Sequence, residues 1–240
     1  MVYENLPYIF QLVCGVIQYV LTVTHDVIGS WFGAIVVLAI LMRVITHLLY
    51  RRSLQLNADY LDKQKRIKPR ILKAREDFSE SWLEREEEVR KIHKEEGVSA
   101  FAPMYSAGIL LIQIPILISV ANVMSLYPGL KDQSFLWIND LSKPDELFSL
   151  GFSIPLLGSH LNLTPCLMLA VQLVAPVFFH NYTEDPPTRK KSLYSNGVMG
   201  LIFFVLLYNF PSGLVLYWTC ANLFASIQMA MITKALSKKS

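Results

Sequence analysis

Long apolar runs alternate with shorter polar stretches along most of the chain. A helix needs about 20 predominantly apolar residues to cross the hydrocarbon core of a bilayer. Runs that meet or approach this length cover residues 28–50, 105–126, 163–179, 196–210 and 213–236. The fourth is short for a full crossing, which local thinning of the bilayer or packing against neighbouring helices would accommodate. The pattern predicts an all-α integral membrane protein with five transmembrane helices.

A further apolar segment, residues 7–23, precedes the first of these runs. It carries several polar side chains, among them Gln11, Gln18, Thr22 and Thr24. By length it could also cross the membrane, but a sixth crossing would bring the chain ends and the basic loops into conflict. We therefore expect an outer N-terminal segment, residues 1–27, whose helix lies along the membrane surface.

The connection between the first two predicted spans, residues 51–97, is strongly charged. Of the 41 charged side chains in the protein, 24 fall within it. Sparse apolar residues recur there among strong helix formers, which predicts two helices, with Pro69 and residues 79–81 as the interruptions. We expect a charged helical hairpin on the cytoplasmic face.

Basic residues cluster beside three of the predicted membrane boundaries. The clusters are Arg51 and Arg52, residues 189–191 within the loop 180–195, and Lys238 and Lys239 within the tail 237–240. With five crossings all three share one side, whereas the opposite loop, residues 127–162, is more acidic than basic. The positive-inside rule then predicts an outside N-terminus and a cytoplasmic C-terminus.

The composition narrows the class of protein further. Hydrophobic residues make up 53% of the chain and charged residues 17%, an unusual balance for a soluble surface. The net charge of +3 is small and the basic residues interleave with acidic ones, so we expect no direct nucleic-acid partner. Cys14, Cys166 and Cys220 lack the paired spacing of a metal site or a disulfide framework. The first ten residues contain Glu4 and no basic residue, so we expect no cleavable signal peptide.

Arg43 is the residue most informative about function. A cation inside a transmembrane helix costs roughly 2.5–3.5 kcal/mol on insertion scales. At 1.5 Å per residue, Arg43 lies about 10 Å before the end of the first span, so it could extend its charge to the interface. Alternatively, it faces a water-filled cavity between helices. Thr46 and His47, three and four positions later on the same helical face, favour the cavity.

Polar side chains on two other predicted spans support a shared hydrophilic groove. Ser106 and Gln113 lie on one stripe of the second span, and Thr219, Asn222 and Ser226 lie on the fifth. Each would prefer a wet interior to lipid, although any one alone also fits an ordinary interhelical hydrogen bond. Their joint presence on three helices beside a buried cation predicts a groove that binds substrate.

The spans lack the groups that most catalytic and cofactor sites need. His47 could be imagined as a metal ligand or a proton relay, but no carboxylate lies inside any predicted span. No nucleophile-elbow spacing accompanies a set of Ser, His and acidic residues. We therefore expect no enzyme activity, no catalytic residues, no bound metal and no cofactor.

Three segments resemble the YidC family of membrane protein insertases, which also has members in mitochondria and chloroplasts. They are FPSGLVLYWTCAN at residues 210–222, similar to the family's F-P-[AS]-G-L-x-L-Y-W-x-x-x-N, FLWINDLSKPD at 135–145 and LIQIP at 111–115. Arg43 stands where the family keeps its groove arginine. Leu48 replaces a usual proline, and Ser99 and Ala100 replace Asn-Pro, so the chain resembles a divergent member.

The resemblance implies a mechanism. Family members enclose a hydrophilic groove that opens to the cytoplasm and sideways to lipid. Arg43 and the polar stripes would then lower the penalty for drawing a hydrophilic segment into the membrane. An apolar substrate segment would move into lipid along the third and fifth spans, whose apolar faces include Leu169, Leu173, Leu214 and Leu216.

The resemblance also implies partners and a location. The partners are newly made membrane proteins and the lipid bilayer, with a Sec-type translocon or a ribosome left open. The absence of an Arg-rich transit segment favours the plasma (inner) membrane of a bacterium over an organellar inner membrane. Two other functions remain alternatives: a non-inserting assembly scaffold, and a small channel or transporter, which would usually show an intramembrane acid or inverted repeats.

Overall fold

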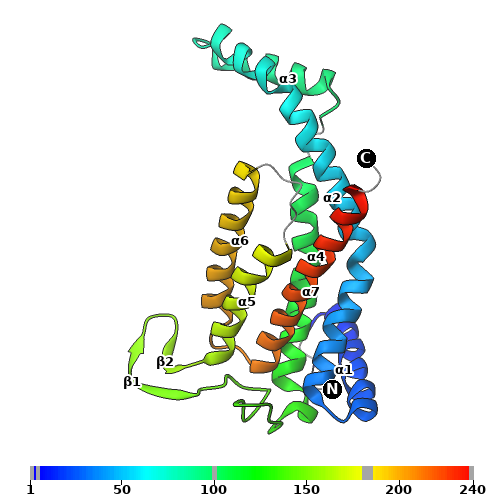
Figure 1. The fold of residues 1–240 in the computed structure, drawn as a ribbon, viewed down its shortest axis with the longest axis vertical. Helices are drawn as coiled ribbons and strands as arrows, with labels where there is room; N and C mark the ends of the chain where they lie inside the picture. Colours follow the sequence, from blue (N-terminus) through cyan, green and yellow to red (C-terminus); the bar gives the residue numbers. More distant parts are fainter. Residues whose placement is uncertain (1–2, 4–5, 99–101, 180–185, 238–240) are drawn as a thin grey trace. The chain divides into compact units, whose positions relative to one another are not determined.

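The structure, a computed structural model, describes residues 3, 6–98, 102–179 and 186–237 (Figure 1). The helical side chains left outside this description are those of residues 49–50, 53–55, 57–58, 61, 102–113, 186–189, 191–192 and 232–237. The elements follow the order α1 (Tyr8–Ile28), α2 (Trp31–Asp77), α3 (Trp82–Glu95), α4 (Ala102–Leu126), a short 3₁₀ turn η1 (Pro128–Leu130), β1 (Phe148–Ile154), β2 (Gly158–Leu161), α5 (Leu163–Phe179), α6 (Pro186–Leu207) and α7 (Ser212–Ser237). They form two compact units, one of Met1–Ile45 with Pro115–Ser240 and one of Thr46–Ile114.

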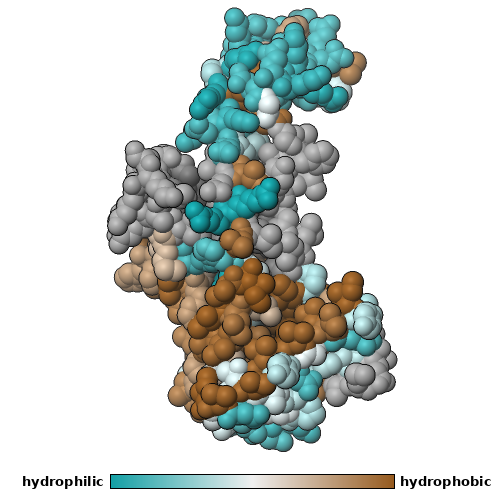
Figure 2. Space-filling view, turned by 90° about the vertical axis from the view of Figure 1, so that its right-hand side faces the viewer, coloured by the Kyte–Doolittle hydropathy of each residue, from teal (hydrophilic) through white to brown (hydrophobic). Residues whose placement is uncertain are grey.

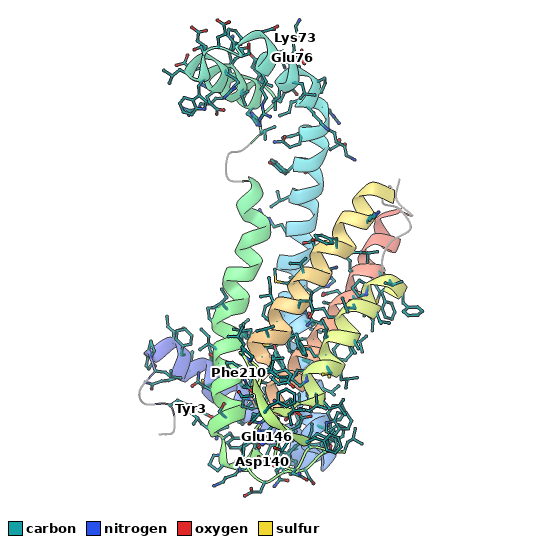
Figure 3. All side chains as sticks on the ribbon, turned by 90° about the vertical axis from the view of Figure 1, so that its left-hand side faces the viewer. Tyr3, Lys73, Glu76, Asp140, Glu146 and Phe210 are labelled. Carbon is teal, nitrogen blue, oxygen red and sulfur yellow. The ribbon has the colours of Figure 1, made fainter. Side chains whose placement is uncertain are left out.

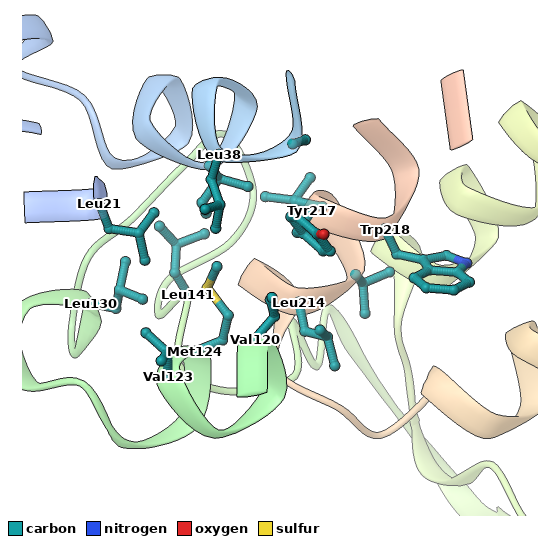
Figure 4. Packing of buried hydrophobic residues seen from close by; sticks show 14 of the residues in the cluster. Leu21, Leu38, Val120, Val123, Met124, Leu130, Leu141, Leu214, Tyr217 and Trp218 are labelled. Atoms are coloured by element: carbon teal, nitrogen blue, oxygen red, sulfur yellow. The ribbon is translucent and has the colours of Figure 1, made fainter. Parts of the chain in front are cut away.

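The first unit has an apolar core supplied by α1, α2, α4 and α7 (Figure 4). The buried positions of α1 are Cys14, Ile17 and Leu21, so a single stripe of this helix faces the protein. The first turns of α7 differ, because every residue from Ser212 to Thr219 is buried. The start of α7 is therefore enclosed on all sides.

Much of the remaining surface of α1 is also apolar, although it is exposed. Seven large side chains on it are 43–81% exposed: Tyr8, Ile9, Leu12, Val16, Tyr19, Val23 and Val27. Figure 2 shows a broad hydrophobic area on the side of the molecule that carries α1 and the start of α2. A helix with large exposed apolar side chains beside its buried stripe is suited to contact with lipid.

Six helical stretches in the described part of the chain have membrane-like composition. Three are long and apolar enough to cross a bilayer: Tyr8–Ile28, Trp31–Leu48 and Ser212–Met231. Three shorter ones are Ile114–Leu126, Leu163–Phe179 and Leu193–Leu207. All but the first overlap predicted spans, and the predicted class, an α-helical integral membrane protein, is confirmed. The number of crossings and the bounds of the spans stay predictions.

Two local features of the helices differ from the sequence prediction. Pro69 lies inside α2 and does not interrupt it. An internal proline removes one hydrogen bond and costs a helix about 3 kcal/mol, but Ile67 and Ala74 are buried on either side of Pro69 and hold the helix together. The predicted interruption at residues 79–81 is observed, since α2 ends at Asp77 and Ser81 caps α3 by accepting the Glu84 N–H at 3.4 Å.

The second unit contains a helical hairpin of α3 and the later part of α2. Its buried apolar residues are Ile67, Ala74, Ile92 and Val98. Around them the surface is charged: the Arg70 guanidinium bonds the Glu95 carboxylate at 2.7 Å and the Glu96 carboxylate at 3.2 Å. The two helices are thus joined by a small core and a rim of ion pairs.

The loop between α4 and α5 contains an antiparallel pair of strands that the sequence analysis did not predict. Phe148 pairs with Leu161 and Ile154 with Gly158, with an irregularity between the two ends. We call residues 147–161 the β1–β2 hairpin. It places an ordered element immediately before α5.

Residues 210–222, the segment with the strongest family resemblance, include the start of α7. They hold the loop between α4 and α5 in place. The Ser212 N–H and hydroxyl both donate to the Lys143 carbonyl at 2.8 Å, and the Gly213 N–H donates to the Leu141 carbonyl at 2.9 Å. These bonds satisfy donors that the first turn of a helix leaves open. A Cβ atom on Gly213 would lie 3.0 Å from the Leu141 oxygen and from the Met124 sulfur, so the close approach requires glycine.

Candidate functional site

Arg43 is half-buried in α2 and reaches the neighbouring helix α7. Its Nε donates to the Ala221 carbonyl at 2.9 Å. A hydrogen bond to a charged group contributes about 1.5–3 kcal/mol, which offsets much of the roughly 2.5–3.5 kcal/mol that a cation costs inside a membrane. The guanidinium is therefore directed at α7.

The predicted polar residues of α7 divide into two kinds. Thr219 and Ser226 donate to carbonyls of their own helix, those of Val215 at 2.7 Å and Asn222 at 3.1 Å. The Nδ2 of Asn222 is buried and has no hydrogen-bond partner among the described residues. Asn222 directly follows the Ala221 carbonyl that Arg43 binds, so an unused donor lies next to the bound cation.

The remaining predicted groove residues belong to the second unit. Thr46 and His47 are half-buried on the continuation of α2. Ser106 and Gln113 lie on α4, but their side chains are outside the described ones. The expectation that these four share a groove with Arg43 stays a prediction.

Among the other polar side chains of the first unit, Gln172 is half-buried and Trp218 is buried, and each holds a buried atom with an unused hydrogen-bonding group. In the part of the chain that the structure describes, neither the Oε1 of Gln172 on α5 nor the Nε1 of Trp218 on α7 has a partner. The Trp218 ring lies 4.5 Å from that of Phe203, measured between centroids. Gln172 was not among the predicted groove residues, although it stands out in the sequence as one amide within an otherwise apolar run.

The four leucines predicted to guide an apolar substrate segment fall in different environments. Leu173 is 45% exposed and Leu169 is half-buried, both on α5. Leu214 and Leu216 are 0% and 4% exposed, inside the core around the start of α7. Figure 4 shows Leu214 among the packed side chains of that core.

An apolar pocket of about 470 Å³ lies between α5 and α7. Its lining consists of Val171, Val174, Ala175, Phe178, Phe179 and Leu223. Its volume is within the range of small-ligand sites, and a lining without charge suits an apolar occupant. Leu223 of the lining is next to Asn222 in the sequence of α7.

Within the described ranges, no group of three or more His, Cys, Asp or Glu side chains is arranged to hold a metal ion. Figure 3 shows many of the charged side chains at the α2–α3 hairpin and others, such as Asp140 and Glu146, in the loop before α5. The chemistry that the described apolar helices offer around Arg43 is therefore hydrogen bonding by this cation and a few amides beside apolar surface.

Apolar helices of membrane length, packed around a cation bonded between two of them, define a multi-pass integral membrane protein. The chain belongs to the 60Kd inner membrane protein family, whose family model matches residues 23–239. This confirms the family resemblance that the sequence motifs indicated.

Named relatives and a solved structure are similar to most of the chain. A membrane protein insertase YidC of Treponema denticola is 30% identical over 228 residues, which cover 93% of this chain and 38% of the relative. One of Prosthecochloris aestuarii is 31% identical over 225 residues, covering 92% and 36%. The chain thus spans little more than a third of these relatives. A structure of an active YidC insertase shares the fold with a TM-score of 0.54 at 22% identity, over 92% of this chain and 46% of that one.

Proposed function

We propose that the protein is a membrane protein insertase, which draws a hydrophilic substrate segment into a polar groove and releases apolar segments into lipid. Relatives at 30–31% identity bear that name, and the family membership supports it. The substrates are newly made membrane proteins, and burial of their apolar segments drives the process without another energy source.

The observation that carries the proposal is the position of Arg43. Its guanidinium is bonded to α7 beside the unused Asn222 amide. A substrate carbonyl or carboxylate needs donors of this kind, because an unsatisfied backbone group costs several kcal/mol in hydrocarbon. Gln172 on α5 supplies an unused acceptor for substrate N–H groups.

Release of the apolar segment is assigned to α5 and the pocket beside it. Leu173 is exposed on α5, and the pocket between α5 and α7 has an apolar lining. Leu214 and Leu216 contribute by supporting the core, since both are buried. Of the four predicted leucines, the proposed release path therefore keeps those of α5 and leaves out Leu214 and Leu216.

The protein's location and orientation belong to the same proposal. It resides in the inner membrane of a bacterium, with the N-terminus outside and the C-terminus in the cytoplasm, as the charge clusters predict. The charged α2–α3 hairpin then faces the cytoplasm and receives the incoming chain. A translocon or a ribosome as a further partner stays a prediction.

The proposal is tested by inserting a short single-span substrate into proteoliposomes that contain the protein. Wild type is compared with Arg43→Ala, Arg43→Lys and Arg51→Ala at equal amounts of folded protein. Arg51→Ala is the matched control, because it removes an exposed arginine from the same helix. We expect Arg43→Ala to abolish insertion, Arg43→Lys to preserve most of it and Arg51→Ala to have little effect.

Two outcomes would contradict the groove mechanism. If Arg43→Ala inserts substrate as wild type does, the cation is dispensable and only the coarser insertase function stands. If wild-type proteoliposomes do not insert the substrate at all while their folding is intact, the assembly scaffold becomes the better proposal.

A further inference from the structure

We propose that the β1–β2 hairpin is a membrane anchor whose apolar tip lies in the interface of the bilayer, at the surface where α5 begins. The partner is the lipid itself, at the boundary between headgroups and acyl chains. The proposal depends on the membrane class of the protein and is independent of the insertase function.

The hairpin exposes large apolar side chains and has no acidic, lysine or arginine residue between 147 and 161. Phe148 is 61% exposed, Phe152 63% and Leu156 78%. The charged side chains of the loop, such as Lys143 and Glu146, stop just before the hairpin. An uncharged element with exposed aromatic rings is suited to the membrane interface and unsuited to water.

Hydrogen bonds fix the hairpin to the end of α6. The Asn209 side chain donates to the Leu156 carbonyl at 3.2 Å, which fixes the tip to the end of α6. The Tyr208 hydroxyl donates to the His160 carbonyl at 3.2 Å, which fixes β2 to the same place. Figure 1 shows the hairpin extending sideways from the bundle beside the end of α6. Its tip therefore lies level with the last turn of an apolar helix.

The exposed surface at the end of α6, next to the hairpin, is mostly apolar, although Asn209 is exposed there as well. Ile202, Val205, Leu206 and Phe210 are apolar and 39–55% exposed along this end of the helix and just beyond it. Surface of this kind on a membrane helix faces acyl chains. The hairpin continues this apolar surface outward to the lipid headgroups.

The backbone at the tip gives an independent reason to assign a role to Leu156. Its φ is +70°, in the left-handed region that bulky residues rarely adopt and that glycine adopts readily. A strained conformation of this kind is common where a side chain is needed for function. Here the strained residue is also the most exposed leucine of the hairpin, and lipid around its side chain accounts for that exposure.

The test places an environment-sensitive fluorophore at Phe152→Cys or Leu156→Cys, with Lys131→Cys as a matched exposed site on the same loop. The three native cysteines are replaced by alanine. The probe is NBD, and the vesicles contain phosphatidylcholine and phosphatidylglycerol with or without a nitroxide near the lipid headgroup. We expect blue-shifted emission and loss of most fluorescence to the nitroxide lipid at both hairpin sites, with neither change at Lys131→Cys.

Two results would overturn the proposal. One is that iodide in the aqueous phase quenches the hairpin sites as strongly as it quenches Lys131→Cys, which would place the tip in water. The other is a blue shift that grows with protein density and is insensitive to the nitroxide lipid, which would place the tip against a second copy of the chain. Both sites are exposed and at no packed position, so labelling leaves the fold intact.

Discussion

At the scale of the residue, Asp145 ties the loop before α5 to the start of that helix. Its Oδ2 accepts hydrogen bonds from the Trp137 indole at 2.9 Å, the Leu163 N–H at 2.8 Å and the Thr164 N–H at 2.9 Å. The carboxylate is 5% exposed and meets the positive end of the α5 dipole. One side chain thus closes a turn and caps a helix.

Replacing Asp145 by alanine should therefore destabilise the protein. The change leaves three donors without an acceptor, and each buried unsatisfied donor costs about 1–3 kcal/mol. We expect a clear fall in the thermal unfolding temperature in detergent micelles, and a smaller fall for Asp145→Asn, which keeps one acceptor oxygen. Equal unfolding temperatures for wild type and Asp145→Ala would show that the loop is not held by this carboxylate.

Asp140 predicts how the same loop responds to acid. Burial acts to raise the pKa of Asp140, but hydrogen bonds from the Ser142 side chain, Lys143 and the Ser142 N–H outweigh it, so the pKa is lowered. A carboxyl whose folded pKa is lowered stabilises the fold above its unfolded pKa of about 3.9, and this stability is lost as the pH falls through the folded pKa. We expect hydrogen exchange around residues 140–143 to be unchanged between pH 7 and 5 and to accelerate below about pH 4, after correction for the intrinsic exchange rate. Asp140→Asn should remove the acid-dependent part.

Individual residues also show what the sequence could and could not predict. Arg43 could be picked out from the sequence alone, because a single cation inside an apolar run carries a free-energy cost in the membrane that other groups have to offset. Its hydrogen-bond acceptor could not be predicted, because the acceptor is the backbone carbonyl of Ala221 and every residue has such a carbonyl. The burial of Leu214 and Leu216 was equally hidden, because the outer face of a membrane helix is as apolar as its inner face.

At the scale of the element, two glycines of α6 set how closely it packs against α5. A Cβ atom on Gly200 would lie 3.3 Å from a Leu169 methyl and 3.5 Å from Gln172, and one on Gly197 would lie 3.6 Å from Leu173. Small residues spaced along one face allow membrane helices to approach each other closely. The α5–α6 contact is built on this spacing.

We expect Gly200→Leu to destabilise the protein by about 1–3 kcal/mol, the usual range for an overpacked interface. Gly200→Ala should cost less, since Leu169 needs to move only a few tenths of an ångström. Val198→Leu is the control, because Val198 lies on the same helix and is 40% exposed. Unfolding in a mixed detergent titration measures all three, and an unchanged midpoint for Gly200→Leu would contradict the close packing.

Some elements could not be read from their local pattern. The strands at Phe148–Ile154 and Gly158–Leu161 are short and carry glycine and proline beside them, so they resemble loop in the sequence. Pro69 predicts a break, yet α2 passes through it, because burial against α3 outweighs the lost hydrogen bond. In both cases contacts from distant parts of the chain decide the outcome.

At the scale of the whole molecule, the sequence was most informative about the environment. Runs of about 20 apolar residues and the concentration of charge in one insert determine the membrane class without knowledge of packing. They do not determine the number of crossings, because α1 is 21 residues long and apolar enough to span. Whether α1 lies on the outer surface or crosses the bilayer stays a prediction.

The two arrangements of α1 make opposite predictions about its ends. If α1 lies on the outer surface, Pro7→Cys and Asp26→Cys, both exposed positions, react with a membrane-impermeant maleimide from the same side of oriented vesicles. If α1 crosses the membrane, only one of them reacts before the vesicles are opened. We expect both to react from outside in right-side-out vesicles that lack the native cysteines, while Lys65→Cys, in the hairpin predicted to be cytoplasmic, reacts only after permeabilisation. Labelling of only one end would establish a sixth crossing and would place the N-terminus on the same side as the C-terminus, because α2 and all later helices keep their orientation.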